Sequence, residues 1–150
     1  IKWKKIKQIN MKNDPIPRVI AKLFIPFILV FALYIQFHGD YGPGGGFQAG
    51  VIFSGGIILY SLIFGISKTQ NLIPPVLVEV LSAIGVLLYG GVGVVCILKG
   101  GEFLNYSVLL NDSVSGQHLG ILLIEFGVFI TVASVMLKLF YLFASRSQKL

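Results

Sequence analysis

Charged residues are scarce in this sequence. Asp, Glu, Lys and Arg make up 12% of its 150 residues, about half the share found in soluble domains. That leaves too little polar surface to cover a water-exposed globule, which excludes an ordinary soluble domain. Hydrophobic residues reach 55% and fall in runs of about 20, the length that an α-helix needs to cross a bilayer.

Cysteine is nearly absent, and patterns of catalytic residues are missing. The single cysteine, Cys96, excludes an internal disulfide, and no CxxC or Cys/His cluster indicates a metal. No Ser/His/Asp arrangement, metal-ligand spacing or cofactor motif is recognisable. We therefore expect a protein that is not an enzyme, binds no cofactor, and uses Cys96 as a small apolar packing residue.

The apolar runs predict an all-α, polytopic membrane protein of about four transmembrane helices. Each run is long enough to cross about 30 Å of hydrocarbon, and Pro26 is expected to kink the first. No small-x-small cleavage site follows the first run, so we expect it to be retained. The predicted spans are residues 19–37, 47–66, 76–98 and 119–143, between a basic tail at 1–18 and a short tail at 144–150.

Positive charge is concentrated on one predicted side of the membrane. The net charge is +6, and a basic tail can in principle touch nucleic acid. Beside a span, however, it more often marks the cytoplasmic side and meets anionic lipid, so we expect no nucleic-acid partner. The distribution predicts that both termini are cytoplasmic. The basic residues on that side are Lys2, Lys4, Lys5, Lys7, Lys12, Arg18, Lys22, Lys68, Arg146 and Lys149.

Small and polar residues recur at helical spacing on three of the spans. Such faces allow helices to approach closely in lipid. Because four helices cannot easily hide all of them from lipid, we expect other membrane subunits to cover some, while packing within one bundle remains the alternative. The faces comprise Gly50, Ser54, Ile57, Ser61 and Gly65; Glu79, Ala83, Val86, Gly90 and Gly93; and Gly127, Thr131, Ser134 and Lys138.

Four charged residues lie within the predicted spans: Glu79, Glu125, Lys22 and Lys138. Glu79 and Lys138 lie at matching depth near the cytoplasmic side, which predicts an ion pair, with Lys22 as a competitor and a proton relay as the alternative for Glu79. Glu125 is predicted about 9 Å inside the outer surface, where Lys99 is the one basic residue at comparable depth. A carboxyl group in apolar surroundings resists ionisation, which suits a group that takes and releases protons.

These considerations make Glu125 a candidate for a proton or cation path, or for contact with a basic residue of a partner. A hydrogen-bonded structural acid is the alternative.

A long glycine-rich segment, His38-Gly39-Asp40-Tyr41-Gly42-Pro43-Gly44-Gly45-Gly46-Phe47-Gln48-Ala49-Gly50, joins the first two spans. Its glycines allow backbone angles closed to other residues. It lacks the Gly-Lys-Ser/Thr ending and the preceding strand of a nucleotide loop. We interpret it as a tight turn or docking element, with direct ion handling by His38 and Asp40 as the alternative.

This segment closely resembles the signature of the MnhB/MrpB family, one of the membrane components of the Mrp (also called Mnh or Sha) multisubunit sodium/proton antiporters. A second resemblance lies in Glu125-Phe126-Gly127-Val128-Phe129, where many relatives have Asp at the acid, so the Glu is a mild departure. The similarity extends from about Arg18 to Leu142. The residues that match the first signature are His38, Gly39, Asp40, Pro43, Gly44, Gly45, Gly46, Phe47, Gln48 and Gly50.

The resemblance implies a multi-pass component of the bacterial inner membrane that works with other subunits to exchange Na⁺ or K⁺ for protons. It implies an accessory role beside larger pumping subunits. Two alternatives remain open: an ion-translocating subunit of a hydrogenase- or respiratory-type complex, and a purely structural assembly subunit.

Overall fold

The computed structural model describes residues 15–39 and 44–147. The tails at 1–14 and 148–150 lie outside the described residues, as do Asp40 and Pro43. Secondary structure in the described part consists of α1 (Pro15–Phe37), α2 (Gly46–Phe64), α3 (Ile66–Leu72), α4 (Pro75–Leu98), the 3₁₀ turn η1 (Tyr106–Val108) and α5 (Ser113–Ser147). Four of these helices are long and apolar enough to cross a membrane, which confirms the predicted all-α membrane class.

Helix α5 is longer than the predicted span at 119–143. It begins six residues earlier because Asp112 caps it, with its Oδ2 accepting hydrogen bonds from the backbone N–H and the hydroxyl of Ser115 at 2.9 and 2.6 Å. It also continues into the predicted tail, to Ser147. Its 35 residues extend about 52 Å, so α5 projects beyond the roughly 30 Å of hydrocarbon.

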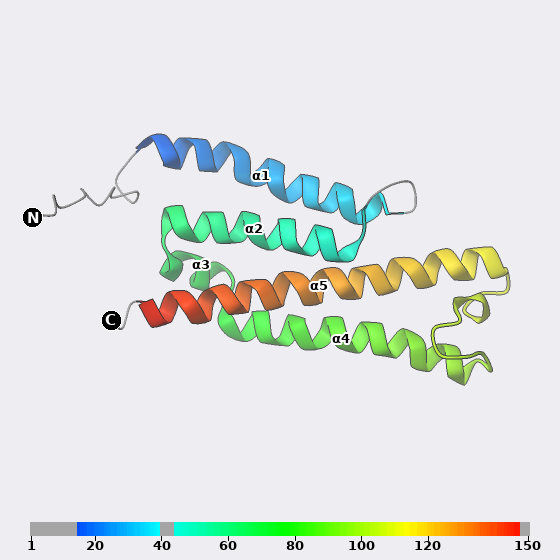
Figure 1. The fold of residues 1–150 in the computed structure, drawn as a ribbon. Coiled ribbons are helices and arrows are strands. Elements are labelled where there is room, and N and C mark those ends of the chain that lie inside the picture. Colours follow the sequence, from blue (N-terminus) through cyan, green and yellow to red (C-terminus); the bar gives the residue numbers. More distant parts are fainter. Residues whose placement is uncertain (1–14, 40–43, 148–150) are drawn as a thin grey trace, which may run out of the picture.

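The four long helices form a single row rather than a closed bundle. Helix α1 packs against α2, α2 against α5 and α5 against α4, while α1 only touches α5 (Figure 1). Between 22% and 33% of the most apolar stretch of each helix is buried within the described structure. Both broad faces of the row are therefore largely uncovered by the described residues of this chain.

Glycines set how closely the middle helices approach. A Cβ atom at Gly46 would lie 2.0 Å from the carbonyl oxygen of Glu125, and one at Gly50 would lie 2.9 Å from that of Phe129. On the other side of α5, a Cβ at Gly85 would lie 2.8 Å from the carbonyl oxygen of Gly127. Backbone contacts of this kind are typical of helices packed in lipid.

The predicted small-residue faces on α2 and α4 differ in whether they are buried against another helix. On α2, Gly50, Ser54 and Ser61 are buried. On α4 the face towards α5 is built from Val78, Gly85 and Val92 instead. On the predicted α4 face, Val86 is largely exposed at the edge of the contact with α5, and a Cβ added at Gly90 would meet nothing within 4 Å.

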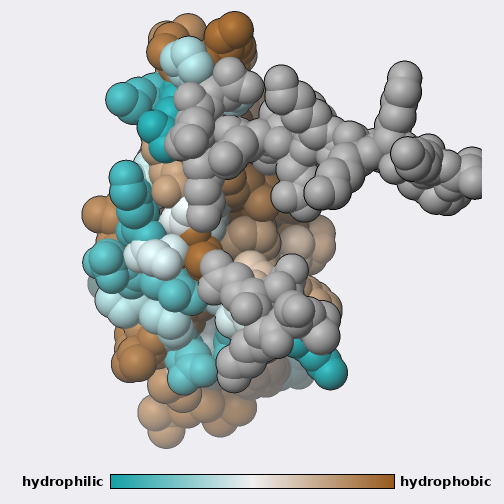
Figure 2. Space-filling model, turned by 90° about the vertical axis from the view of Figure 1, so that its left-hand side faces the viewer, coloured by the Kyte–Doolittle hydropathy of each residue, from teal (hydrophilic) through white to brown (hydrophobic). Residues whose placement is uncertain are grey.

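The two ends of the row differ in polarity. The start of α1, the short helix α3 and the end of α5 lie together at one end (Figure 1), and hydrophilic side chains gather across it (Figure 2). At the other end, the connection after α4 folds back over α4 and α5. There Phe103 covers Gly93, Tyr106 covers Gly120, and Nζ of Lys99 donates a hydrogen bond to the carbonyl oxygen of Leu109.

Candidate functional site

The carboxylate of Glu125 lies against the glycine-rich turn between α1 and α2. A Cβ atom at Gly39 would lie 2.9 Å from Oε1 and 3.0 Å from Oε2 of Glu125, and one at Gly45 would lie 3.4 Å from Oε1. A side chain at Gly39 would therefore compete with the carboxylate for the same space. The structure thus brings together two features that lie about 80 residues apart in the sequence.

The turn folds tightly onto the last turn of α1. The carbonyl oxygen of Ile35 accepts hydrogen bonds from the backbone N–H groups of His38 and Gly45, both at 3.3 Å. A Cβ at Gly44 would lie 2.8 Å from the same oxygen. Gly45 has a φ of 125°, which L-residues rarely adopt. This geometry explains why consecutive glycines lead into α2.

The first turn of α2 shapes the electrostatics of this site. Helix α2 begins at Gly46, and the first N–H groups of a helix have no partner within it. Together with the helix dipole they favour a nearby negative charge. The half-buried carboxylate of Glu125 lies at this positive helix end.

The predicted depth of Glu125, about 9 Å, counts from a helix start at residue 119, whereas α5 begins at Ser113. Twelve residues, or about 18 Å, therefore lie between that start and Glu125. The α1–α2 turn lies at the level of Glu125, and α4 and α5 extend beyond it (Figure 1). The site thus lies at a step at the end of the row opposite the polar end.

The other predicted residues of the turn lie in different surroundings, and not all of them are near Glu125. The ring of His38 stacks on that of Tyr34, with centroids 4.9 Å apart, and Asp40 lies outside the described residues. Phe47, at 64% exposure, and Gln48 are exposed on α2 and do not join the site. They remain available to lipid or to a partner.

Sequence reasoning missed Gln36, on the last turn of α1. Its side chain is 3% exposed, and its Oε1 is buried without a hydrogen-bond partner in the described structure. The one feature of the sequence that could have indicated this residue is that Gln36 is a lone amide within the apolar run at 19–37.

The predicted pair of Glu79 and Lys138 lies at the opposite end of the row. Nζ of Lys138 is 3.2 Å from Oε1 of Glu79, and the side chains are 44% and 58% exposed, respectively. Ion pairs this exposed contribute little to stability in water, about 0–1 kcal/mol. Lys22 belongs to α1, at the far side of the row from α4 (Figure 1), so the structure does not support it as a competitor.

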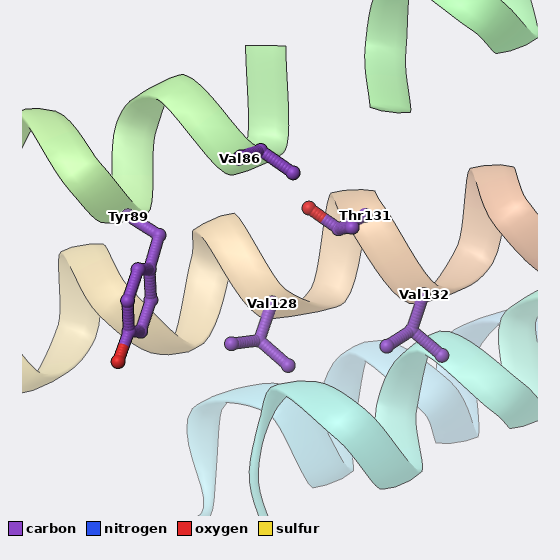
Figure 3. Close-up of a pocket in the computed structure, with 5 residues that line it drawn as sticks. All are labelled: Val86, Tyr89, Val128, Thr131 and Val132. Carbon is purple, nitrogen blue, oxygen red and sulfur yellow. The ribbon is translucent and has the colours of Figure 1, made fainter. Parts of the chain in front are cut away.

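A groove of about 170 Å³ opens between α4 and α5. Figure 3 shows Val86 and Tyr89 of α4 beside Val128, Thr131 and Val132 of α5. The hydroxyl of Thr131 donates to the carbonyl oxygen of Gly127 at 2.8 Å. Because that hydroxyl is engaged and the other lining groups are mostly apolar, the groove resembles a packing surface more than an ion site.

The fold and this carboxylate site define a multi-pass helical membrane protein with an acid held beneath a glycine turn. Residues 16–138 match the family described as "Domain related to MnhB subunit of Na+/H+ antiporter". Proteins of Staphylococcus aureus strains Newman, JH1 and COL, each named "Putative antiporter subunit mnhB2", are 32% identical over 127 residues, which cover 83% of this chain and 89% of theirs. The chain belongs to the MnhB family.

Proposed function

We propose that this chain is a membrane subunit of a multisubunit complex that exchanges Na⁺ or K⁺ for protons, and that it acts as part of a transporter rather than as an enzyme. Support comes from the family match over residues 16–138 and from the four helices suited to crossing a membrane. The family description names an antiporter, which favours this function over the hydrogenase or respiratory alternative.

Within that complex, Glu125 takes part in the proton or cation route. The observation that carries this proposal is the contact of its carboxylate with Gly39 and Gly45, at the start of α2. Ionisable groups inside membrane spans often mark ion pathways, and a carboxylate can hold either a proton or a monovalent cation.

The polar end of the row faces the cytoplasm of a bacterial cell in this proposal. Five basic residues of the described structure support that orientation, since cytoplasmic segments carry an excess of Lys and Arg. The glycine turn then lies towards the outer face of the inner membrane. These residues are Arg18, Lys22, Lys68, Lys138 and Arg146.

The test replaces Glu125 with Gln in the assembled complex, with Glu79→Gln as the matched control. Cation-dependent proton movement is measured in everted membrane vesicles, alongside the abundance of the complex. We expect Glu125→Gln to lose at least about tenfold in rate, a loss typical of removing a group that transfers protons, and Glu79→Gln to retain most activity. Full exchange by Glu125→Gln at normal abundance would remove it from the route and leave a structural assembly role.

A further inference from the structure

A broad apolar groove lies between α1 and α2, at the edge of the row. It has a volume of about 590 Å³, compared with about 170 Å³ for the groove between α4 and α5. Ile16, Ile20 and Phe24 on its wall are each more than half exposed, so the groove is open to the surrounding membrane. Its larger lining side chains are Ile16, Ile20, Phe24 and Ile28 of α1 and Leu59 and Ile63 of α2.

The groove is about as long as one leaflet of a bilayer is deep. The part of α1 that lines it, from Ile16 to Ile28, extends about 18 Å at 1.5 Å per residue. One leaflet contributes about half of the roughly 30 Å of hydrocarbon. The groove begins at the polar end of the row, where α1 starts and α2 ends (Figure 1). Its length and position therefore suit an acyl chain of the lipid leaflet at that end.

The lining favours an acyl chain over a helix of another subunit. Where helices of this chain pack closely, glycines let the backbones approach, as Gly50 does on α2 and Gly85 on α4. No glycine lines the α1–α2 groove, and its one small non-proline residue, Ala21, is already buried. The branched and aromatic side chains at its surface keep a second backbone at a distance, whereas a flexible hydrocarbon chain can adapt to them.

Basic residues lie at the end of the groove where a lipid headgroup belongs. Arg18 directly follows Pro17, which lines the groove, and Lys22 follows one turn later on α1. Nε of Arg18 is buried and has no hydrogen-bond partner in the described structure. Among the described residues the acid at this end is Glu79, which pairs with Lys138. Because a guanidinium group binds phosphate oxygens through paired N–H donors, Arg18 suits a phosphate headgroup.

We propose that the α1–α2 groove binds one anionic phospholipid, with an acyl chain along the groove and the headgroup phosphate held by Arg18. Lys22 adds a second positive charge close to the same headgroup. Basic pockets between membrane helices are typical sites for anionic headgroups. A zwitterionic lipid can fill the same apolar space, but its own positive group weakens the attraction. The site should therefore prefer an anionic lipid, whether or not the complex is exchanging ions.

The test uses the complete complex in liposomes made of phosphatidylglycerol and phosphatidylcholine in equal amounts. A trace of one lipid or the other carries a photoactivatable diazirine on its acyl chain, and mass spectrometry measures the label on residues 16–28 and 59–63. We expect the phosphatidylglycerol probe to label these segments at least about fivefold more than the phosphatidylcholine probe, and Arg18→Gln to remove most of that preference. Lys68→Gln is the matched control, because Lys68 is an exposed base on α3, on the side of α2 away from α1 (Figure 1); it should keep the preference.

Two further variants test the charge near Arg18. Arg18→Lys keeps the positive charge but loses the planar pair of donors, so it should assemble normally and show an intermediate preference. Asp14 precedes Arg18 by four residues in the sequence and lies outside the described residues. Asp14→Asn should leave the preference unchanged or raise it, and a loss of preference in this variant would contradict the proposal.

Ile20→Trp tests the groove itself, because a larger side chain takes up part of its volume. Label from both probes should fall several-fold, whereas Val19→Trp should keep it, since Val19 is exposed and does not line the groove. Equal labelling by the two probes, or wild-type labelling in assembled Arg18→Gln and Arg18→Lys complexes, would overturn the proposal. Cross-links from the groove to another subunit or to the tail at 1–14, in place of lipid label, would also overturn it.

Discussion

At the scale of single residues, the acid and the glycines that surround it depend on each other. The sequence marks both Glu125 and the glycine segment, and the resemblance to antiporter subunits links them to one family. Their contact was not predictable, because hydrophobic periodicity shows which residues share a face but not which helices are neighbours. Gln36 was missed for the same reason: one amide in an apolar run is informative only once its surroundings are known.

Gly46 provides a direct test of this close packing. We expect Gly46→Ala to destabilise the protein by about 1–3 kcal/mol or more, because its Cβ would lie 2.0 Å from the carbonyl oxygen of Glu125, a backbone atom that cannot swing aside. Thermal unfolding of the detergent-solubilised complex measures the effect.

Gly55→Ala is the matched control on the same helix, since a Cβ there meets nothing within 4 Å. It should leave the unfolding temperature unchanged or raise it slightly, because alanine favours a helix interior more than glycine does. Equal stability of the two variants would show that α2 and α5 are not packed as closely as described.

At the scale of elements, apolar runs located the four spans well but did not locate their ends. Within the described residues, helix α1 runs from Pro15, four residues before the predicted span. Helix α5 begins early because Asp112 caps it. Caps and polar helical turns carry no hydropathy signal, so the extension of α5 beyond the predicted span was not predictable.

The Asp112 cap predicts a pH dependence confined to the start of α5. Hydrogen bonds from the Ser115 hydroxyl and backbone N–H lower the pKa of Asp112 below its ordinary value. The cap is therefore fully stabilising above the unfolded-state pKa of about 3.9 and is lost as the pH falls through the lower folded-state pKa. Hydrogen exchange over residues 113–120 should show this loss.

Asp112→Asn is the reference for that measurement, because an amide also caps helices but does not titrate. Relative to this variant, wild-type protein should exchange faster only in acid. The same difference at neutral and acidic pH would contradict a role for the charged carboxylate.

At the scale of the whole molecule, the single row of helices accounts for the expected need for partners. Small residues predicted to face neighbours are divided between contacts inside the chain and an uncovered face of α4. A sequence pattern cannot distinguish these two outcomes, since a glycine suits both. The structure distinguishes the two outcomes, because α4 lies at the edge of the row of helices and contacts mainly α5.

Gly90, on the uncovered face of α4, tests whether a partner lies there. A leucine at this position meets no atom of this chain near its Cβ, so the chain itself should change in stability by no more than about 0.5 kcal/mol. We expect Gly90→Leu to reduce co-purification of other subunits several-fold, while Gly90→Ala has a smaller effect. Undiminished recovery of the complex with the leucine variant would place the partners elsewhere.

The proposed role of the Glu125 carboxylate, beneath the glycine turn, is to take part in cation/proton exchange. The most direct measurement compares exchange rates of complexes carrying Glu125→Asp and Glu125→Gln at equal abundance. We expect the Asp variant to retain a substantial part of the wild-type rate, whereas the Gln variant falls below about a tenth of it. Equal rates for the two variants would contradict the claim, because only one of them keeps an ionisable group at this position.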